Sequence, residues 1–525
     1  MRLQRDLRGR MALASGVAAA VAMTQVPETS RPWLRMRSRT EVQLQADGRH
    51  RRSAGQRFAS AAAPPLVGMR MAGAYDSAVP RALGVEDQGP YLSDLLTRVG
   101  YALVLLAVPL VTCNALRASA SVSYGDIPLA LAATLLFVAW LGHGHPRGVV
   151  PLALPVCGSI LVVTGFVAIM ANGDVESLAP TLRFAVTLAV MPLAVMYAAS
   201  TPRRLERIVD MWLLAAGLNA AVAALDVLGL TSIGFSLTSV NYVEFTDRPT
   251  GLTLHPNHLG LVTAMALPVA VARLGSGGVR GLTALGLVPL LIVGVIESAS
   301  RGALLAAGAS VVILFALGVS TRRSRTTLLL IAAPVVTFAI IVAVLGNNEL
   351  TGSVAFDRLS GGSGATQSDT ERRVTLDNSL DKAVANPVVG SGFSDVRTAH
   401  NIYVQLLQAG GLLALGGFIA FAVSIVRRAR WLALAPRGLP PSLMSLAAGS
   451  GASLCVWLLF GGVGNAIFDR YLYIPVGITL GLGLVHRRFF VIAEPTMPSA
   501  PTQRSGQVIG EGSTVTRRDR PLSLR

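Results

Sequence analysis

The sequence predicts an all-α membrane protein, a polytopic bundle of about twelve transmembrane helices with one outer loop domain between the ninth and tenth helices. Hydrophobic residues make up 52% of the 525 residues and charged residues only 14%, whereas a soluble domain carries about 25% charged residues. The mean hydropathy is +0.56. A chain of this composition cannot hide its apolar surface from water by folding as a soluble globule.

Nearly uncharged windows recur from Val99 onward, and each is about long enough to cross the roughly 30 Å hydrocarbon layer of a membrane. They lie near residues 99–116, 127–142, 149–171, 179–199, 211–230, 258–272, 281–296, 302–319, 327–346, 402–426, 441–463 and 472–485. Residues 98–346 would thus hold helices one to nine, and residues 402–488 helices ten to twelve. Residues 347–401 would form the outer loop domain.

The arginines predict the orientation of the bundle. With a cytoplasmic N-terminus, every short inside loop carries arginine, as the positive-inside rule requires. These residues are Arg147, Arg203, Arg204, Arg207, Arg273, Arg280, Arg322, Arg323, Arg325, Arg427, Arg428, Arg430 and Arg437. We therefore expect a multi-pass protein of the inner (plasma) membrane with both termini in the cytoplasm. The net charge of +17 follows from this topology and does not indicate nucleic-acid binding, because the arginines are spread between helices.

Both ends of the chain are predicted to be disordered tails, residues 1–97 and 489–525. The first tail opens with a basic and then an apolar stretch that resemble a signal peptide. Cleavage there would place the Arg-rich residues 31–57 outside, against the orientation of the later loops. A disordered cytoplasmic tail, or a true start at Met69 or Met71, fits better. The second tail is rich in Pro, Ser, Thr and Arg, which cannot form a core.

Three helices, the sixth, eighth and tenth, are predicted to begin at the outer surface beside cationic groups. Arg248 precedes the sixth helix, Arg301 starts the eighth and His400 precedes the tenth, with Asn257, Ser300 and Asn401 as expected N-caps. A cation at a helix N-terminus is unfavourable unless an anion is bound there, and the free N–H groups of a helix start bind phosphate. Arginine adds paired donors matched to phosphate oxygens.

His400 is the candidate general base. A helix N-terminus lowers the pKa of a nearby imidazole and favours the neutral form, which accepts a proton. We expect it to take the proton from an acceptor hydroxyl as that oxygen attacks an anomeric carbon, while Arg248 and Arg301 stabilise the departing lipid diphosphate.

The outer loop is predicted to contain an amphipathic helix. Residues 360–365 have the composition of a flexible hinge, and Ser368 with Glu371 has the spacing of a capping box. The helix would then end at Asn386-Pro387. Arg372 and Arg373 would lie in its first turn, where a bound anion would again offset their charge. The apolar positions of this helix are Leu376, Leu380, Ala383 and Val384.

The chain resembles the O-antigen ligase and polymerase family over residues 248–411. The resemblance rests on the order of Arg-x-x-Gly, Pro-Asn-x-Leu-Gly, Ser-Arg-Gly-Ala, Asn-Pro-x-x-Gly-x-Gly, His-Asn-x-Tyr and a Gly-Gly pair. It implies a metal-independent, inverting glycosyltransferase without a cofactor, with an undecaprenyl-diphosphate glycan as donor and a glycan or lipid as acceptor. Arg248, Arg301 and His400 match its essential positions. His255 stands where the family usually has Asn or a similar residue.

Other interpretations of these residues remain open. Arg372, Arg373, Asn257, Asn401 and Tyr403 are candidates for substrate binding, but outside arginines also anchor lipid headgroups, and Asn or Tyr at a helix start also caps or packs. His255, His258 and His400 have the ligand count for zinc, although Pro256 disturbs their spacing and no acidic or Cys partner is evident, so no metal site is expected. Asp226 and Arg183 are ionisable groups in predicted spans and could face a central cavity.

The function also has alternatives. A polysaccharide polymerase of the same family would use the same site. A flippase for the lipid-linked glycan would also require a basic cavity. It should in addition carry charged residues near the middle of the membrane, and most of the predicted spans have none. A scaffold protein would not need His and Arg at converging helix ends.

Overall fold

The computed structural model describes residues 91–117, 122–143, 153–173, 175–239, 248–275, 278–317, 363–393, 399–434 and 439–493. These residues belong to one unit, Glu86–Arg525. Within the described ranges all regular elements are helices, so the predicted all-α class is confirmed. The first described helix begins at Tyr91 and the last continues to Ala493, past the predicted limits of 98 and 488. The rest of the two predicted tails lies outside the described residues.

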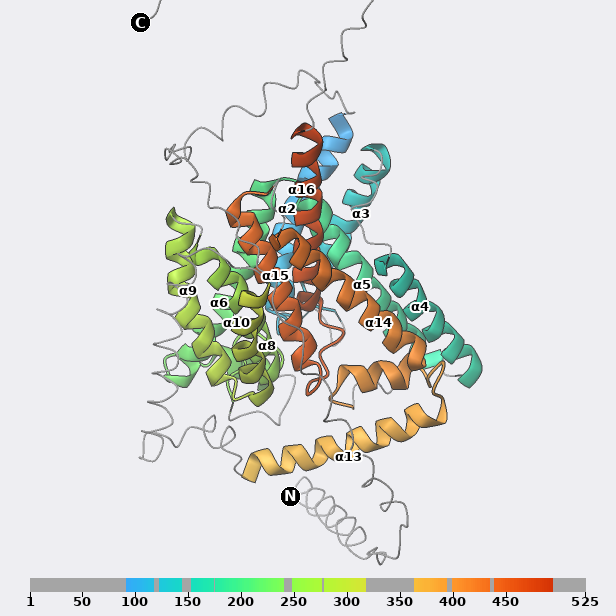
Figure 1. Ribbon diagram of the computed structural model, residues 1–525. Helices are drawn as coiled ribbons and strands as arrows, with labels where there is room; N and C mark the ends of the chain where they lie inside the picture. The colour runs from blue at the N-terminus through green and yellow to red at the C-terminus, as the bar shows by residue number, and fades with distance from the viewer. Residues whose placement is uncertain are drawn as a thin grey trace, which may run out of the picture. The chain divides into compact units, whose positions relative to one another are not determined.

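All but one of the predicted spans coincide with a described helix (Figure 1). These helices are α2 (Tyr91–Thr112), α3 (Asp126–His143), α4 (Ala153–Asn172), α5 (Leu178–Ala198), α6 (Pro202–Val227), α8 (Pro256–Leu274), α9 (Gly278–Glu297), α10 (Arg301–Ala316), α14 (Ile402–Leu434), α15 (Pro441–Phe460) and α16 (Ile474–Ala493). The span predicted near residues 327–346 lies outside the described residues. By length and composition, 7 helical segments can cross a membrane, which supports a multi-pass membrane protein. The total of about twelve spans remains a prediction.

Helix α8 lies inside the bundle, and its N-terminus contributes to the candidate site. It packs against α6, α9, α10 and α15, and its side chains from Leu259 to Arg273 are all buried. Small residues allow this close packing, since a Cβ on Gly294 of α9 would lie only 2.8 Å from side-chain atoms of Ala220 and Thr263. Four neighbouring helices therefore fix the position of α8.

Helix α14 is broken near its start. Gly410 and Gly411 leave the helical conformation, and residues 402–409 lie across the direction of the longer part (Figure 1). Gly411 has a φ of 63°, and a Cβ there would lie 2.1 Å from the carbonyl oxygen of Val388. Only glycine suits this position. The break is held by the segment before it, because Leu412 N donates to Pro387 O at 2.8 Å.

Helix α13 (Ser363–Ala385) lies in the segment predicted to be the outer loop, and it contacts α14. It begins before Ser368, so the predicted capping box is wrong and Arg372 and Arg373 lie well inside the helix instead of in its first turn. The predicted end at Asn386 is confirmed. The buried face also differs from the predicted one, because Ser379 and Ala383 are buried whereas Val384 is exposed.

Candidate functional site

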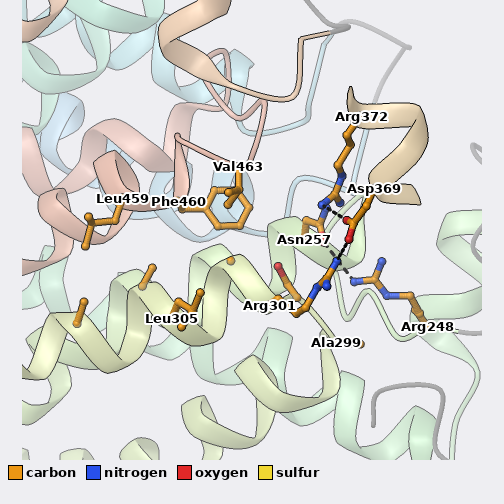
Figure 2. Close-up of a pocket in the computed structure, with 14 residues that line it drawn as sticks. Arg248, Asn257, Ala299, Arg301, Leu305, Asp369, Arg372, Leu459, Phe460 and Val463 are labelled. Carbon is orange, nitrogen blue, oxygen red and sulfur yellow. Dashed lines mark hydrogen bonds and ion pairs between the residues drawn. The ribbon is translucent and has the colours of Figure 1, made fainter. Parts of the chain in front are cut away.

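A cavity of about 550 Å³ lies where α8, α10, α13 and α15 meet (Figure 2). Its polar wall comes from three of the predicted arginines, Arg248, Arg301 and Arg372, together with Asn257 and Asp369. Its apolar wall comes from α10 and the end of α15, with the side chains of Leu305, Ala306, Ala309, Leu459, Phe460 and Val463. The cavity thus combines a cationic end with an apolar flank.

Arg248 is buried at the base of this polar wall, with 5% of its surface exposed. Its Nη2 donates to the carbonyl oxygen of Ser298, just before α10, and to Asn257 Oδ1 at 3.2 Å. Asn257 therefore holds Arg248, and the prediction that it is the N-cap of α8 is wrong. That cap is His255, whose Nδ1 accepts a hydrogen bond from the Asn257 backbone N–H at 3.0 Å. Because Nδ1 is an acceptor, the proton of the neutral His255 ring is on Nε2.

Arg301 is the first residue of α10, directly after the predicted N-cap Ser300. The Ser300 hydroxyl accepts from Ala303 N at 3.4 Å, so this cap is confirmed. Ala299 before it has a positive φ of 49°, an uncommon conformation for a residue with a Cβ. This turn directs Arg301 toward α13, where its Nη2 lies 2.5 Å from Asp369 Oδ2.

Asp369 joins two arginines from different helices. Its other oxygen, Oδ1, lies 3.9 Å from Arg372 Nη1 on the same helix (Figure 2). The charged groups that line the cavity are therefore three arginines and one carboxylate, which leaves a net charge of 3 − 1 = +2. Such an excess of positive charge beside a helix N-terminus favours a bound anion.

His400 precedes the N-cap of α14 in a strained conformation, with a φ of 47°. The predicted cap is confirmed, since Asn401 Oδ1 accepts from the backbone N–H of Tyr403 at 2.9 Å and of Val404 at 3.2 Å. Asn401 Nδ2 donates to Gly462 O at 3.0 Å, and Tyr403 OH donates to Leu458 O at 2.6 Å. Both side chains thus tie the start of α14 to the end of α15, which lines the cavity.

Burial and then the nearby Arg372 charge lower the pKa of the His400 imidazole, while Glu371 opposes this shift. This direction favours the neutral imidazole near pH 7, and its identified causes are burial and an arginine of α13. Burial, followed by the charges of His258, Arg248, Arg372 and His400, holds the pKa of His255 well below its ordinary value. His400 thus lies within electrostatic range of the arginine cavity.

The remaining candidates take other places. Arg373 is exposed on α13 and does not line the cavity. His258 pairs with Asp469 at 3.6 Å, and within the described ranges no group of three His, Cys, Asp or Glu residues could hold a metal ion. Asp226 accepts from the backbone N–H of Ile233 at 3.0 Å and of Gly234 at 2.8 Å, so it caps the short helix α7 (Ile233–Ser239).

The sequence interpretation missed Asp369. The available signal was a carboxylate three residues before Arg372 in a segment predicted to face outward. That spacing places the two side chains on one face of a helix. The partner on α10 is 68 residues away in sequence and could not be identified from local pattern.

A comparison with protein families supports the resemblance. The family model described as O-antigen ligase matches residues 286–419. This range contains Arg301, Asp369, Arg372, His400 and the break in α14, whereas Arg248 and Asn257 precede it. A search of the curated proteins gives no match. Residues 286–419 are thus similar to the O-antigen ligase family, which supports over this range the resemblance seen in the sequence motifs.

Proposed function

We propose that this protein is a membrane glycosyltransferase that moves a glycan from an undecaprenyl-diphosphate donor to an acceptor hydroxyl on the outer side of the membrane. The observation that carries the proposal is the cavity with net positive charge, whose other wall is apolar. It rests on a membrane orientation with both termini in the cytoplasm, which the arginine distribution predicts.

A lipid diphosphate fits both halves of the cavity. Its phosphate oxygens would accept from the guanidinium groups of Arg248, Arg301 and Arg372, each of which offers planar paired donors. The isoprenoid chain would follow the apolar wall formed by α10 and α15, along Leu305 and Leu459. A soluble sugar nucleotide would make no use of that wall.

The chemistry would be a single displacement. The acceptor oxygen attacks the anomeric carbon as His400 takes its proton, and the bond between that carbon and the diphosphate oxygen breaks. The electron pair leaves with the diphosphate, whose growing charge the arginines stabilise. Attack opposite the leaving group inverts the anomeric configuration. Each step uses side chains of this chain and needs neither a metal ion nor a cofactor.

The test is transfer by the purified chain in detergent, with a lipid-diphosphate glycan, an acceptor and no energy source. We expect a glycosylated acceptor and free lipid diphosphate from the wild type and neither from His400→Ala. Full transfer by His400→Ala would refute the role of the base. A wild type that forms no product in detergent, but moves the lipid across the bilayer after reconstitution into vesicles, would instead identify a flippase.

The same assay separates the ligase from the alternative within the family. A polymerase of polysaccharide repeats would bind the same donor in the same cavity, so the residues described above do not distinguish the two. Product size does, because a polymerase gives a ladder and a ligase a single adduct.

A further inference from the structure

Two arginines converge at the ends of α6 and α16 that the arginine distribution predicts to be cytoplasmic. Arg204 is in the first turn of α6, and Arg488 is near the end of α16. Both contact Ser200 in the short connection between α5 and α6. Arg488 Nη1 donates to Ser200 O at 2.8 Å, and Arg204 Nη1 donates to Ser200 Oγ at 3.5 Å. The two guanidinium groups are close enough to repel each other.

Within the described residues no carboxylate lies at ion-pair distance from either guanidinium. Two other arginines at the same predicted side are neutralised, because Arg273 pairs with Asp210 and Arg280 lies 2.5 Å from Glu206. The positive-inside rule explains why arginines occur on this side. It does not explain why two of them turn toward one serine without an acidic partner.

A buried tyrosine contacts this arginine pair. The Arg204 guanidinium lies 5.0 Å from the centroid of the Tyr101 ring on α2. Tyr101 is only 9% exposed, so its ring supports the Arg204 guanidinium from the side of the bundle. The N-terminus of α6 contributes further partial positive charge.

We propose that Arg204 and Arg488, held in place by Ser200 and Tyr101, form a binding site for the phosphate of an anionic phospholipid. The level in the membrane supports a lipid over a soluble phosphate. The predicted span of α16 ends at residue 485. At a rise of 1.5 Å per residue, Arg488 lies about 4.5 Å beyond that end, at the level of the lipid headgroups. Arg488 is exposed and can reach a headgroup, while Arg204 is half-buried behind it. This site is independent of the proposed transferase reaction.

The experiment measures lipid binding by the purified full chain in a neutral detergent. The unfolding temperature is followed during titration with dioleoyl phosphatidylglycerol, with dioleoyl phosphatidylcholine and with inorganic phosphate. We expect a rise with phosphatidylglycerol alone. Each arginine near a membrane surface contributes about fivefold to the affinity for anionic lipid, so Arg204→Gln/Arg488→Gln should lower the apparent affinity roughly thirtyfold.

Arg430→Gln is the matched control, because it removes one exposed arginine from the same predicted side without touching the site. It should keep the wild-type affinity. If the double variant does not fold, the single Arg488→Gln change on the exposed surface should still lower the affinity about fivefold. The control Arg430→Gln is compared with the folded double variant or, if that does not fold, with Arg488→Gln. Equal affinities for phosphatidylglycerol in the two compared proteins would overturn the site. An equal response to inorganic phosphate would overturn the assignment to a lipid.

Discussion

Replacing Arg301 by Ala should weaken donor binding strongly while leaving the fold intact. Arg301 lines the cavity at the first position of α10, with 41% of its side chain exposed. A hydrogen bond to a charged group contributes about 1.5–3 kcal/mol, which corresponds to about 10- to 150-fold in affinity. The lost ion pair with Asp369 is half-exposed and would cost at most about 1 kcal/mol of stability.

The assay is binding of a polyprenyl diphosphate to the purified chain, with unfolding temperature measured in parallel. The matched control is Arg373→Ala, which removes an exposed arginine of α13 outside the cavity and should bind the donor as the wild type does. An Arg301→Ala protein that binds the diphosphate as tightly as Arg373→Ala would refute the placement of the leaving group in this cavity.

Asp369→Asn provides the opposite perturbation. The carboxylate shares the Arg301 and Arg372 guanidinium groups that the diphosphate would use, so neutralising it should raise donor affinity or leave it unchanged. A loss of donor affinity comparable to that in Arg301→Ala would show that Asp369 binds substrate or positions the arginines, and would contradict the competition inferred here.

Three further outcomes are expected. Arg372→Gln removes a charge that lowers the His400 pKa, so the pKa should rise toward its ordinary value. Transfer needs the neutral imidazole and is lost as the pH falls through the His400 pKa. In the variant this loss should therefore occur at a higher pH than in the wild type. A rate–pH profile with an unchanged acid limb would contradict this role of Arg372. Gly411→Ala places a Cβ 2.1 Å from a carbonyl oxygen at a φ of 63° and should sharply reduce folded protein on size-exclusion chromatography, whereas Gly416→Ala, with nothing within 4 Å, should not. Addition of EDTA should leave the initial rate of transfer unchanged, and a rate restored only by a divalent ion would refute the metal-independent mechanism.

The sequence predicted most of what depends on local pattern. Long apolar windows identify the helices because the membrane interior requires every backbone group to be bonded within its own segment. Ser300 and Asn401 were predicted as N-caps because a short polar side chain before an apolar run satisfies the first N–H groups of a helix. The grouping of Arg248 with Arg301 followed from the common direction of their helices.

The features that the sequence did not predict depend on competing local signals or on contacts between residues distant in the sequence. Ser368 and Glu371 have capping-box spacing, but the helix already runs from Ser363, so the same two residues lie within it. His255 caps α8 with an imidazole nitrogen, although Asn257 is the more usual capping residue. The pKa of His400 is lowered mainly by burial and then by Arg372 of α13, and both depend on contacts that the fold brings about.

The Arg301–Asp369 pair also links donor binding to the position of α13. One guanidinium cannot make its strongest bonds to the carboxylate and to a diphosphate with the same N–H groups, so a bound donor would weaken the contact between α10 and α13. Arg372 moves with α13 and helps to keep His400 neutral, so a shift of this helix would change the protonation of the base at the moment the donor enters. Donor binding and proton acceptance would then be coupled through a single helix, and loss of the Asp369 carboxylate should uncouple them.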